Sequence, residues 1–194
     1  MSIVDTIRDR FEASAHIPAP LAGDTVLLHE GEPVPAAVLI AIVDRPEPGL
    51  LLTKRDEALR KHPGQVAFAG GRADPEDAGP IETALREAWE EIGLPPELVS
   101  VIGCDRPYHT ITGFLIVPVV GIVPPDLPLA AREFEVADIF EVPLAHVLDP
   151  TNQVRREAEL RGVRREFYEI LWEDRRIWGA TAAMIVNLSR RLAA

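Results

Sequence analysis

Three largely apolar runs along the chain predict strands of a buried sheet. Residues 36–43 and 50–54 flank a turn sequence at 46–49, and residues 114–123 form a third run. Runs of this length, bounded by proline and glycine, are typical of strands that are covered on both faces. We therefore expect residues 36–54 to form a hairpin inside the sheet.

A helical period follows between Pro80 and Ile92. Apolar side chains recur there at spacings of three and four residues, and Gly93 with the prolines after it ends the pattern. Further elements are expected at weaker patterns: helices at 1–11, 142–148 and 179–192, strands at 64–68 and 99–104, and a polar hairpin from 157–161 and 167–172. Strands with interspersed helices predict an α/β fold, a three-layer α/β/α sandwich.

Net charge and composition indicate which kinds of molecule the protein can bind. The formal net charge is −11 at pH 7, which argues against general binding to nucleic acid. No apolar run approaches the roughly 18 residues of a membrane span. The single cysteine, Cys104, cannot form an intramolecular disulfide, as is usual in the cytoplasm. We expect a cytoplasmic protein with a small-molecule partner and with neither a nucleic acid nor a membrane partner, and the oligomeric state stays open.

The helix expected at 80–92 carries its acidic residues on one side. At 100° per residue, Glu87, Glu90 and Glu91 lie within about 100° of one another, opposite a stripe that includes Ile81 and Ile92. Like charges one turn apart destabilise a helix by roughly 0.2 to 0.5 kcal/mol per pair, so a bound cation is expected to offset their repulsion. Carboxylate oxygens suit Mg²⁺ or Mn²⁺, which often bind together with phosphates. The alternative interpretation is a solvated acidic face.

Basic residues before this helix would let an acidic protein bind a phosphate compound locally. They are Lys54, Arg55, Arg60, Lys61 and Arg72. A second basic group lies between residues 155 and 165 and alternates with glutamates. That second group is explained equally well by a solvated strand surface.

Residues 71–94 hold a longer pattern, in which a glycine-rich loop precedes the sequence REAWEEIGL. This stretch resembles the Nudix box, G-x5-E-x7-R-E-U-x-E-E-x-G-U with U an aliphatic residue. The loop is one residue longer than in the box, and Asp77 stands near the place of the first glutamate. The resemblance implies a single Nudix hydrolase domain over residues 1–194, with a mixed sheet and a helical appendage at 1–34. It also implies metal-dependent hydrolysis of a diphosphate anhydride, with Mg²⁺ or Mn²⁺ as cofactor.

The segment before the box is distinctive as well. Residues 51–71 read LLTKRDEALRKHPGQVAFAGG and are similar to the signature of the coenzyme A pyrophosphatase branch of the family, with Ala69 where that branch usually carries proline. This implies cleavage of coenzyme A, or of an acyl or oxidised derivative, to 4′-phosphopantetheine, or its acyl form, and adenosine 3′,5′-bisphosphate. The alternatives are a Nudix pyrophosphatase for another nucleoside diphosphate derivative, such as ADP-ribose, and a non-catalytic module that binds coenzyme A or a nucleotide.

Helix geometry and the resemblance together assign roles at the metal. The expected ligands are Glu87, Glu90 and Glu91, with a backbone carbonyl of Gly70 or Gly71 completing the shell. Glu90 or Glu135 would act as general base, and the alternative for Glu135 is an exposed acid without a role. Arg86 is expected to orient the glutamates through a pairing with Glu90.

Substrate contacts are expected from the signature segment. The candidates are Arg55, Arg60, His62, Gln65, Gly70 and Gly71. Arg55 and Arg60 would bind phosphate through forked donors, whereas a structural hydrogen bond is an equally good explanation for His62.

Two further pairs of residues are expected to have structural roles. Asp74 and Asp77 would brace the loop, because aspartate accepts backbone N–H bonds in turns. Trp172 and Trp178 would pack as core anchors.

Overall fold

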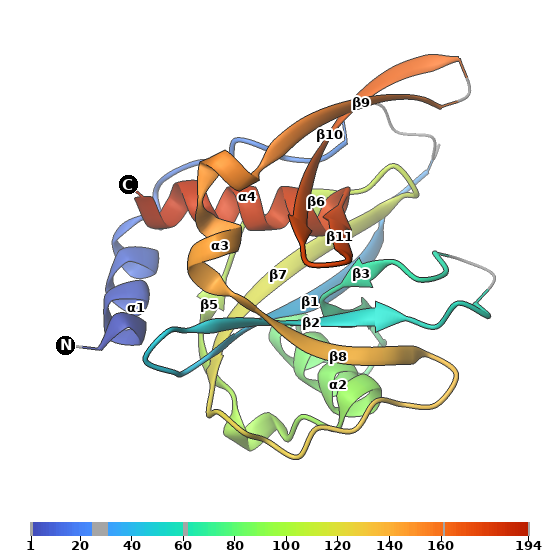
Figure 1. Ribbon diagram of the computed structural model, residues 1–194. Helices are drawn as coiled ribbons and strands as arrows, with labels where there is room; N and C mark the ends of the chain where they lie inside the picture. The colour runs from blue at the N-terminus through green and yellow to red at the C-terminus, as the bar shows by residue number, and fades with distance from the viewer. Residues whose placement is uncertain (1, 25–30, 60–61, 161, 194) are drawn as a thin grey trace.

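The computed structural model describes residues 2–24, 31–59, 62–160 and 162–193. Its larger sheet is built around β1 (Val34–Val43), which pairs in parallel with β7 (Phe114–Val123) and antiparallel with β2 (Gly49–Arg55) and β4 (Ala69–Arg72). The sheet continues with β3 (Val66–Ala67), β5 (Ser100–Cys104), β6 (Tyr108–His109) and β8 (Val136–Pro143). The parallel β1–β7 pair among antiparallel neighbours makes the sheet mixed, as expected (Figure 1).

The continuous apolar sequence of β1 reflects burial on both faces of the sheet. Leu39 and Ala41 pack on the side of α2 (Pro80–Ile92), whereas Ile40 and Ile42 join the core on the side of α4 (Ala180–Ala193). The period of two along a strand therefore divides one apolar run between two cores.

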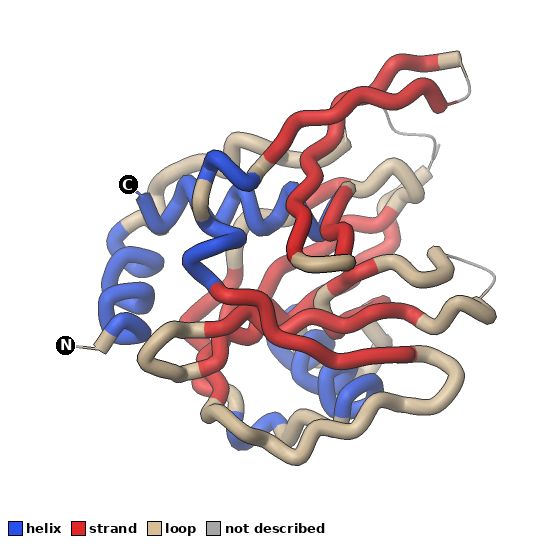
Figure 2. The backbone as a smooth tube through the Cα atoms, viewed as in Figure 1, coloured by secondary structure: helices blue, strands red, loops and turns tan. Residues whose placement is uncertain are grey.

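Helices cover both faces of the sheet (Figures 1 and 2). α2 lies on one face, while α1 (Ile3–Ala13), α3 (Leu144–Leu148) and α4 contribute to the core on the other. This is the three-layer α/β/α sandwich that the sequence pattern predicts. Two short 3₁₀ turns, Pro96–Leu98 and Pro150–Asn152, complete the helical elements of the described residues.

α2 begins and ends at the residues that the sequence predicts. Pro80 occupies the first turn, where its missing N–H is harmless, and Gly93 ends the helix with φ at 65°, a left-handed conformation that suits glycine. The buried face differs from the predicted stripe, because Ile81 is exposed and Thr83 and Ala84 are fully buried. The apolar stripe is therefore shifted around the helix, toward the acidic side.

A second, smaller sheet joins β9 (Val154–Leu160), β10 (Val163–Trp172) and β11 (Arg175–Trp178), all antiparallel. The sequence predicts the β9–β10 hairpin but makes its strands too short. It misses β8 and β11, and also the short strands β4 and β6. Only Val136 and Val142 of β8 are buried, and the strand carries Asp138 and Glu141 between them, so it lacks the apolar run that marks the central strands. The predicted helix at 142–148 consequently starts too early, since residues 142 and 143 end β8.

The N-terminal helix packs against the last one. α1 buries Val4, Ile7 and Phe11, and Arg191 of α4 donates hydrogen bonds to the carbonyl of Phe11 at 2.8 Å and to Oγ of Ser14 at 3.1 Å. Among the helices of the described residues, none is long and apolar enough to cross a membrane.

Candidate active site

The glycine-rich loop brings backbone and carboxylates together. β4 pairs with β1 and places Gly70 and Gly71 beside α2. A Cβ on Gly70 would lie 2.4 Å from the carbonyl oxygen of Ala37, and a Cβ on Gly71 would lie 2.6 Å from the carboxyl carbon of Glu87. Only glycine leaves room for β1 on one side and for a glutamate on the other.

Glu91 is buried, with only 9% of its surface exposed. One of its carboxylate oxygens accepts a hydrogen bond of 3.1 Å from the backbone N–H of Gly70. Burial raises the pKa of Glu91 to about 7, helped by the charges of Glu87 and Glu135 and opposed by the Gly70 N–H and by Arg55. A solvated acidic face does not describe this residue.

Glu87 and Glu90 extend the site toward solvent. Glu87 lies against Gly71 and its pKa is raised chiefly by burial, although Nη1 of Arg86 donates to it at 3.0 Å. Glu90 is more exposed and lies 3.5 Å from the same Nη1. The three glutamates therefore form a gradient from the buried Glu91 to the exposed rim of α2.

Arg86 bonds mainly to the glycine-rich loop and only secondarily to Glu90. Its Nε and Nη2 donate to the two carboxylate oxygens of Asp77 at 3.1 and 3.0 Å, and Nη2 also donates to the carbonyl of Arg72 at 3.0 Å. The expected pairing with Glu90 is present, but as the longest of these contacts. Arg86 thus connects the loop to Glu87: its forked pair of hydrogen bonds holds Asp77, and its Nη1 binds Glu87.

Asp77 is the anchor of the lengthened loop. It accepts hydrogen bonds from Oγ1 of Thr83 at 2.8 Å and from the backbone N–H of Asp74 at 2.9 Å. The Arg86 guanidinium holds the pKa of Asp77 well below its usual range. The loop is braced as the sequence suggests, with Asp77 as the principal acceptor.

Glu135 reaches the site from a distant segment. The backbone N–H of Arg132 donates to the carbonyl of Glu91 at 2.9 Å, and the N–H of Asp56 donates to the carbonyl of Glu135 at 3.1 Å. The Glu135 side chain is 44% exposed and 3.6 Å from Arg132, and its charge acts on Glu91. Glu87, Glu90, Glu91 and Glu135, with Gly70 and Gly71, are called the carboxylate site below.

The donors of the carboxylate site fit a hard divalent cation. They are carboxylate oxygens beside glycine backbone, and the buried like charges of Glu87 and Glu91 would be relieved by a cation. Within the described part of the chain, no three Asp, Glu, His or Cys side chains converge closely enough to form a complete cage. Glu90 and Glu135 are more exposed and lie at the rim of this site.

Arg55 connects the carboxylate site to a cavity of about 720 Å³, which is called the large cavity below. Arg55 lies at the end of β2, and its charge lowers the pKa of Glu91. Its Nε is buried and has no hydrogen-bond partner among the described residues. A buried donor of this kind is expected to have a ligand. Arg60, the other predicted phosphate-binding residue, lies outside the described residues.

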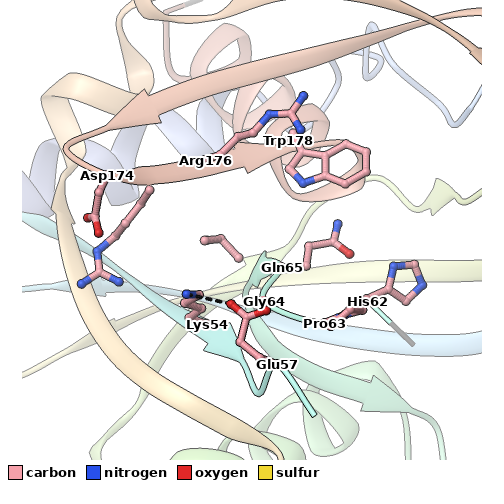
Figure 3. Close-up of a pocket in the computed structure, with 11 residues that line it drawn as sticks. Lys54, Glu57, His62, Pro63, Gly64, Gln65, Asp174, Arg176 and Trp178 are labelled. Carbon is pink, nitrogen blue, oxygen red and sulfur yellow. Dashed lines mark ion pairs between the residues drawn. The ribbon is translucent and has the colours of Figure 1, made fainter. Parts of the chain in front are cut away.

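His62 and Gln65 lie between two cavities. Both line the large cavity and also a smaller one of about 420 Å³, called the small cavity below. In Figure 3 they lie across the small cavity from Arg176 and Trp178 of β11. The backbone N–H of Arg55 donates to the carbonyl of Gln65 at 3.0 Å, which fixes Gln65 beside Arg55.

Trp178 is a wall of both cavities, so its interpretation as a core anchor is wrong. Trp172 does pack, edge to face with His146 at 4.8 Å between ring centroids. Phe167 and Arg165 of β10 also line the large cavity and were not foreseen as site residues. The apolar residues of β10 and β11 gave no sequence signal that separates a cavity wall from a core.

The second basic group is mostly a ladder of ion pairs across the small sheet. Arg155 pairs with Glu166, Arg164 with Glu157, and Arg156 with Glu169, which also pairs with Arg176. The solvated-surface interpretation therefore holds for Arg155, Arg156 and Arg164. Arg165 is the exception, because it is buried in the cavity wall.

Comparisons with known proteins give the family of the chain. A family model described as NUDIX domain matches residues 33–169. Two relatives named uncharacterized Nudix hydrolase NudL are similar over 157 residues, 81% of this chain and 82% of theirs: that of Cronobacter sakazakii at 50% identity and that of Escherichia coli K12 at 48%.

Solved structures share the fold at low sequence identity. A MutT/nudix family protein from Enterococcus faecalis has a TM-score of 0.53 at 16% identity and covers 100% of this chain and 75% of its own. The Nudix hydrolase RenU of M. smegmatis has a TM-score of 0.50 at 22% identity, over 61% of this chain and 75% of its own.

The chain belongs to the Nudix family of hydrolases. It is a hydrolase of pyrophosphate bonds, and enzymes of this family generally need divalent metal ions such as Mg²⁺ or Mn²⁺.

Proposed function

We propose that this enzyme hydrolyses the pyrophosphate bond of coenzyme A or of its acyl or oxidised derivatives. The products are 4′-phosphopantetheine, or its acyl form, and adenosine 3′,5′-bisphosphate. The observation that carries the proposal is the position of the 51–71 signature: the charge of Arg55, near its start, acts on Glu91, and at its end Gly70 donates to Glu91 while Gly71 lies against Glu87. The segment that resembles the coenzyme A branch therefore borders the carboxylates.

Each group of the carboxylate site has a distinct task in this reaction. Glu87 and Glu91 would hold the cation, with Arg86 and the Gly70 N–H fixing their positions. The Mg²⁺ or Mn²⁺ ions would supply positive charge that offsets the carboxylates and stabilises charge developing on the phosphate oxygens. Arg55 donates to the pyrophosphate from the other side, which satisfies its buried Nε.

The attacking water needs a proton acceptor. Glu90 and Glu135 lie at the rim of the carboxylate site, where water has access. Either carboxylate takes the proton while the anhydride breaks, with the attacking and leaving oxygens in line. The other of these two acids would be a further ligand of the cation.

Product analysis tests this function. The purified chain is incubated with coenzyme A and Mn²⁺, with an excess of chelator as the control. We expect equal amounts of adenosine 3′,5′-bisphosphate and 4′-phosphopantetheine, and neither product with chelator. Release of inorganic phosphate and 3′-dephospho-coenzyme A would contradict pyrophosphate cleavage. Binding of coenzyme A without turnover would favour the non-catalytic module.

A further inference from the structure

The large cavity has apolar walls that the hydrolysis of a pyrophosphate does not require. The apolar side chains that line it come from several elements, among them Ala67 of β3, Phe114 and Ile116 of β7, Ala158 of β9, Phe167 of β10 and Trp178 of β11. Phe167 and Trp178 meet edge to face, 5.8 Å between ring centroids. Aromatic and aliphatic walls of this kind bind apolar groups.

The cavity is continuous with the place of the reaction. Arg55 and Gln65 line it, and the charge of Arg55 also acts on Glu91. A pyrophosphate held between Arg55 and the carboxylate site would therefore direct one of its two substituents into the cavity. The question is which half of the substrate enters.

Charge decides between the two halves. Within the described residues, the large cavity is lined by two arginines and three acids, which are Arg55, Arg165, Asp24, Glu159 and Glu166. A further phosphate gains nothing from such a lining. In the small cavity the cations Lys54, Arg175 and Arg176 outnumber the acids Glu57 and Asp174 (Figure 3). A nucleotide with a 3′-phosphate therefore suits the small cavity better than the large one.

We propose that the large cavity binds the acylated pantetheine arm, so that thioesters with an apolar chain are preferred to free coenzyme A. This rests on the proposed function. Thr112 lines the cavity beside the apolar walls, where its exposed hydroxyl can bond an amide of the arm, whereas the Thr110 hydroxyl is held by Thr112 and by the backbone of Phe114. The methylenes of the acyl chain contact Phe167 and Trp178. Each methylene that is fully buried is expected to lower KM about fourfold.

A chain-length series tests the proposal. KM is measured for coenzyme A and for its acetyl, butyryl, hexanoyl and octanoyl thioesters. We expect KM to fall about two- to fourfold per methylene until the cavity is filled. Ala158 lines the cavity from an exposed position, so Ala158→Phe would fill it at little cost to folding. In this variant KM should no longer fall from coenzyme A to its octanoyl thioester. An equal KM across the series in the wild type would overturn the proposal.

A matched control separates cavity effects from effects on the hairpin. Leu171 is on the same strand as Phe167 but is exposed and outside the cavity lining. Phe167→Ala should flatten the dependence of KM on chain length, and Leu171→Ala should leave it as in the wild type. If both variants behave alike, the dependence does not come from this wall and the proposal is wrong.

The cavity can be tested even if coenzyme A is not a substrate. In that case the proposed function fails, and calorimetry with S-octanoyl-pantetheine and with pantetheine, neither of which carries phosphate, measures the cavity alone. Tighter binding of the octanoyl compound, lost in Ala158→Phe, would support an acyl site. Equal affinity of the two compounds would overturn it.

Discussion

The carboxylate site and the large cavity are built in different ways. Most of the carboxylate site comes from one continuous stretch, residues 70–91, in which the loop and α2 are held together by short-range contacts such as Arg86 with Asp77. The large cavity collects side chains from residues as far apart in the chain as Asp24 and Ala180. The groups that do the chemistry are thus local in sequence, and those that would select the substrate depend on the tertiary fold.

The acids of the loop–helix stretch show the same contrast on a smaller scale. Asp77 has the guanidinium of Arg86 beside it, and its pKa lies below the usual range. Glu91 is buried among like charges, and its pKa rises to about 7. The charge of Asp77 stabilises the loop without any bound ion, because Arg86 compensates it. The charge of Glu91 destabilises the fold unless a cation is bound beside it.

The largest effect is expected at the buried carboxylate. Glu91→Gln keeps the shape of the side chain and its acceptor for the Gly70 N–H, but removes a charged metal ligand. We expect turnover to fall at least about 100-fold with the fold retained. Turnover and circular dichroism of the same preparation provide the measurement. Activity within threefold of the wild type, with normal metal occupancy, would remove Glu91 from the site.

Arg55 lies between the carboxylate site and the large cavity, and its substitution should weaken substrate binding. Arg55→Ala removes a charged hydrogen bond of about 1.5 to 3 kcal/mol, so KM should rise roughly ten- to 150-fold. Because Arg55 acts on Glu91, we expect equal factors for coenzyme A and its 3′-dephosphorylated form. A larger factor for coenzyme A would instead place Arg55 at the 3′-phosphate. Arg55→Lys serves as the control that keeps the charge.

The electrostatic cost of Glu91 should be visible in the stability of the metal-free protein. A carboxyl whose folded pKa is raised stabilises the fold below its unfolded pKa of 4.5, and this contribution is lost as the pH rises through about 7. The glutamine of Glu91→Gln does not ionise, so its contribution to stability does not change with pH. In chelator, the stability of the variant should exceed that of the wild type by on the order of 1 to 3 kcal/mol at pH 8, and the excess should vanish below pH 4.5. Thermal unfolding at several pH values measures it, and a difference that does not change with pH would contradict the account.

The carboxylate of Glu87 can be displaced by a substitution at a neighbouring residue, Gly71. A Cβ at Gly71 would meet the end of the Glu87 side chain, which can swing away, so Gly71→Ala should leave the fold intact and displace the carboxylate. We expect turnover to fall about tenfold, equivalent to about 1.4 kcal/mol. Gly79→Ala is the control, because nothing lies within 4 Å of its added Cβ. Wild-type activity in Gly71→Ala would show that Glu87 need not lie where it does.

The same contrast explains what could be predicted from the sequence. The limits of α2 follow from Pro80 and Gly93, and the central strands follow from their apolar runs, because these signals are local. β8 and β11 were missed, since half-exposed strands lack such runs. The burial of Glu91 could not be foreseen, because it depends on how far α2 turns its acidic side toward β4.

Site residues divide in the same way. The three glutamates and Arg86 were proposed from their spacing on the helix together with the resemblance to the Nudix box. Trp178 was assigned to the core, because whether an aromatic residue fills a core or lines a cavity depends on the segments opposite it. The approach of the 132–135 segment to Glu91 also comes from a long-range contact, so only the family resemblance pointed to Glu135.

The choice between coenzyme A and other nucleoside diphosphate derivatives is decided by kcat/KM for coenzyme A and ADP-ribose, measured side by side with Mg²⁺ and with Mn²⁺. A site matched to the pantetheine arm and to a 3′-phosphate leaves polar groups unpaired with ADP-ribose, at a cost of several kcal/mol in the transition state. We predict that coenzyme A is preferred by at least about 100-fold. Comparable values for the two substrates would contradict the coenzyme A assignment and leave a metal-dependent pyrophosphatase of broader specificity.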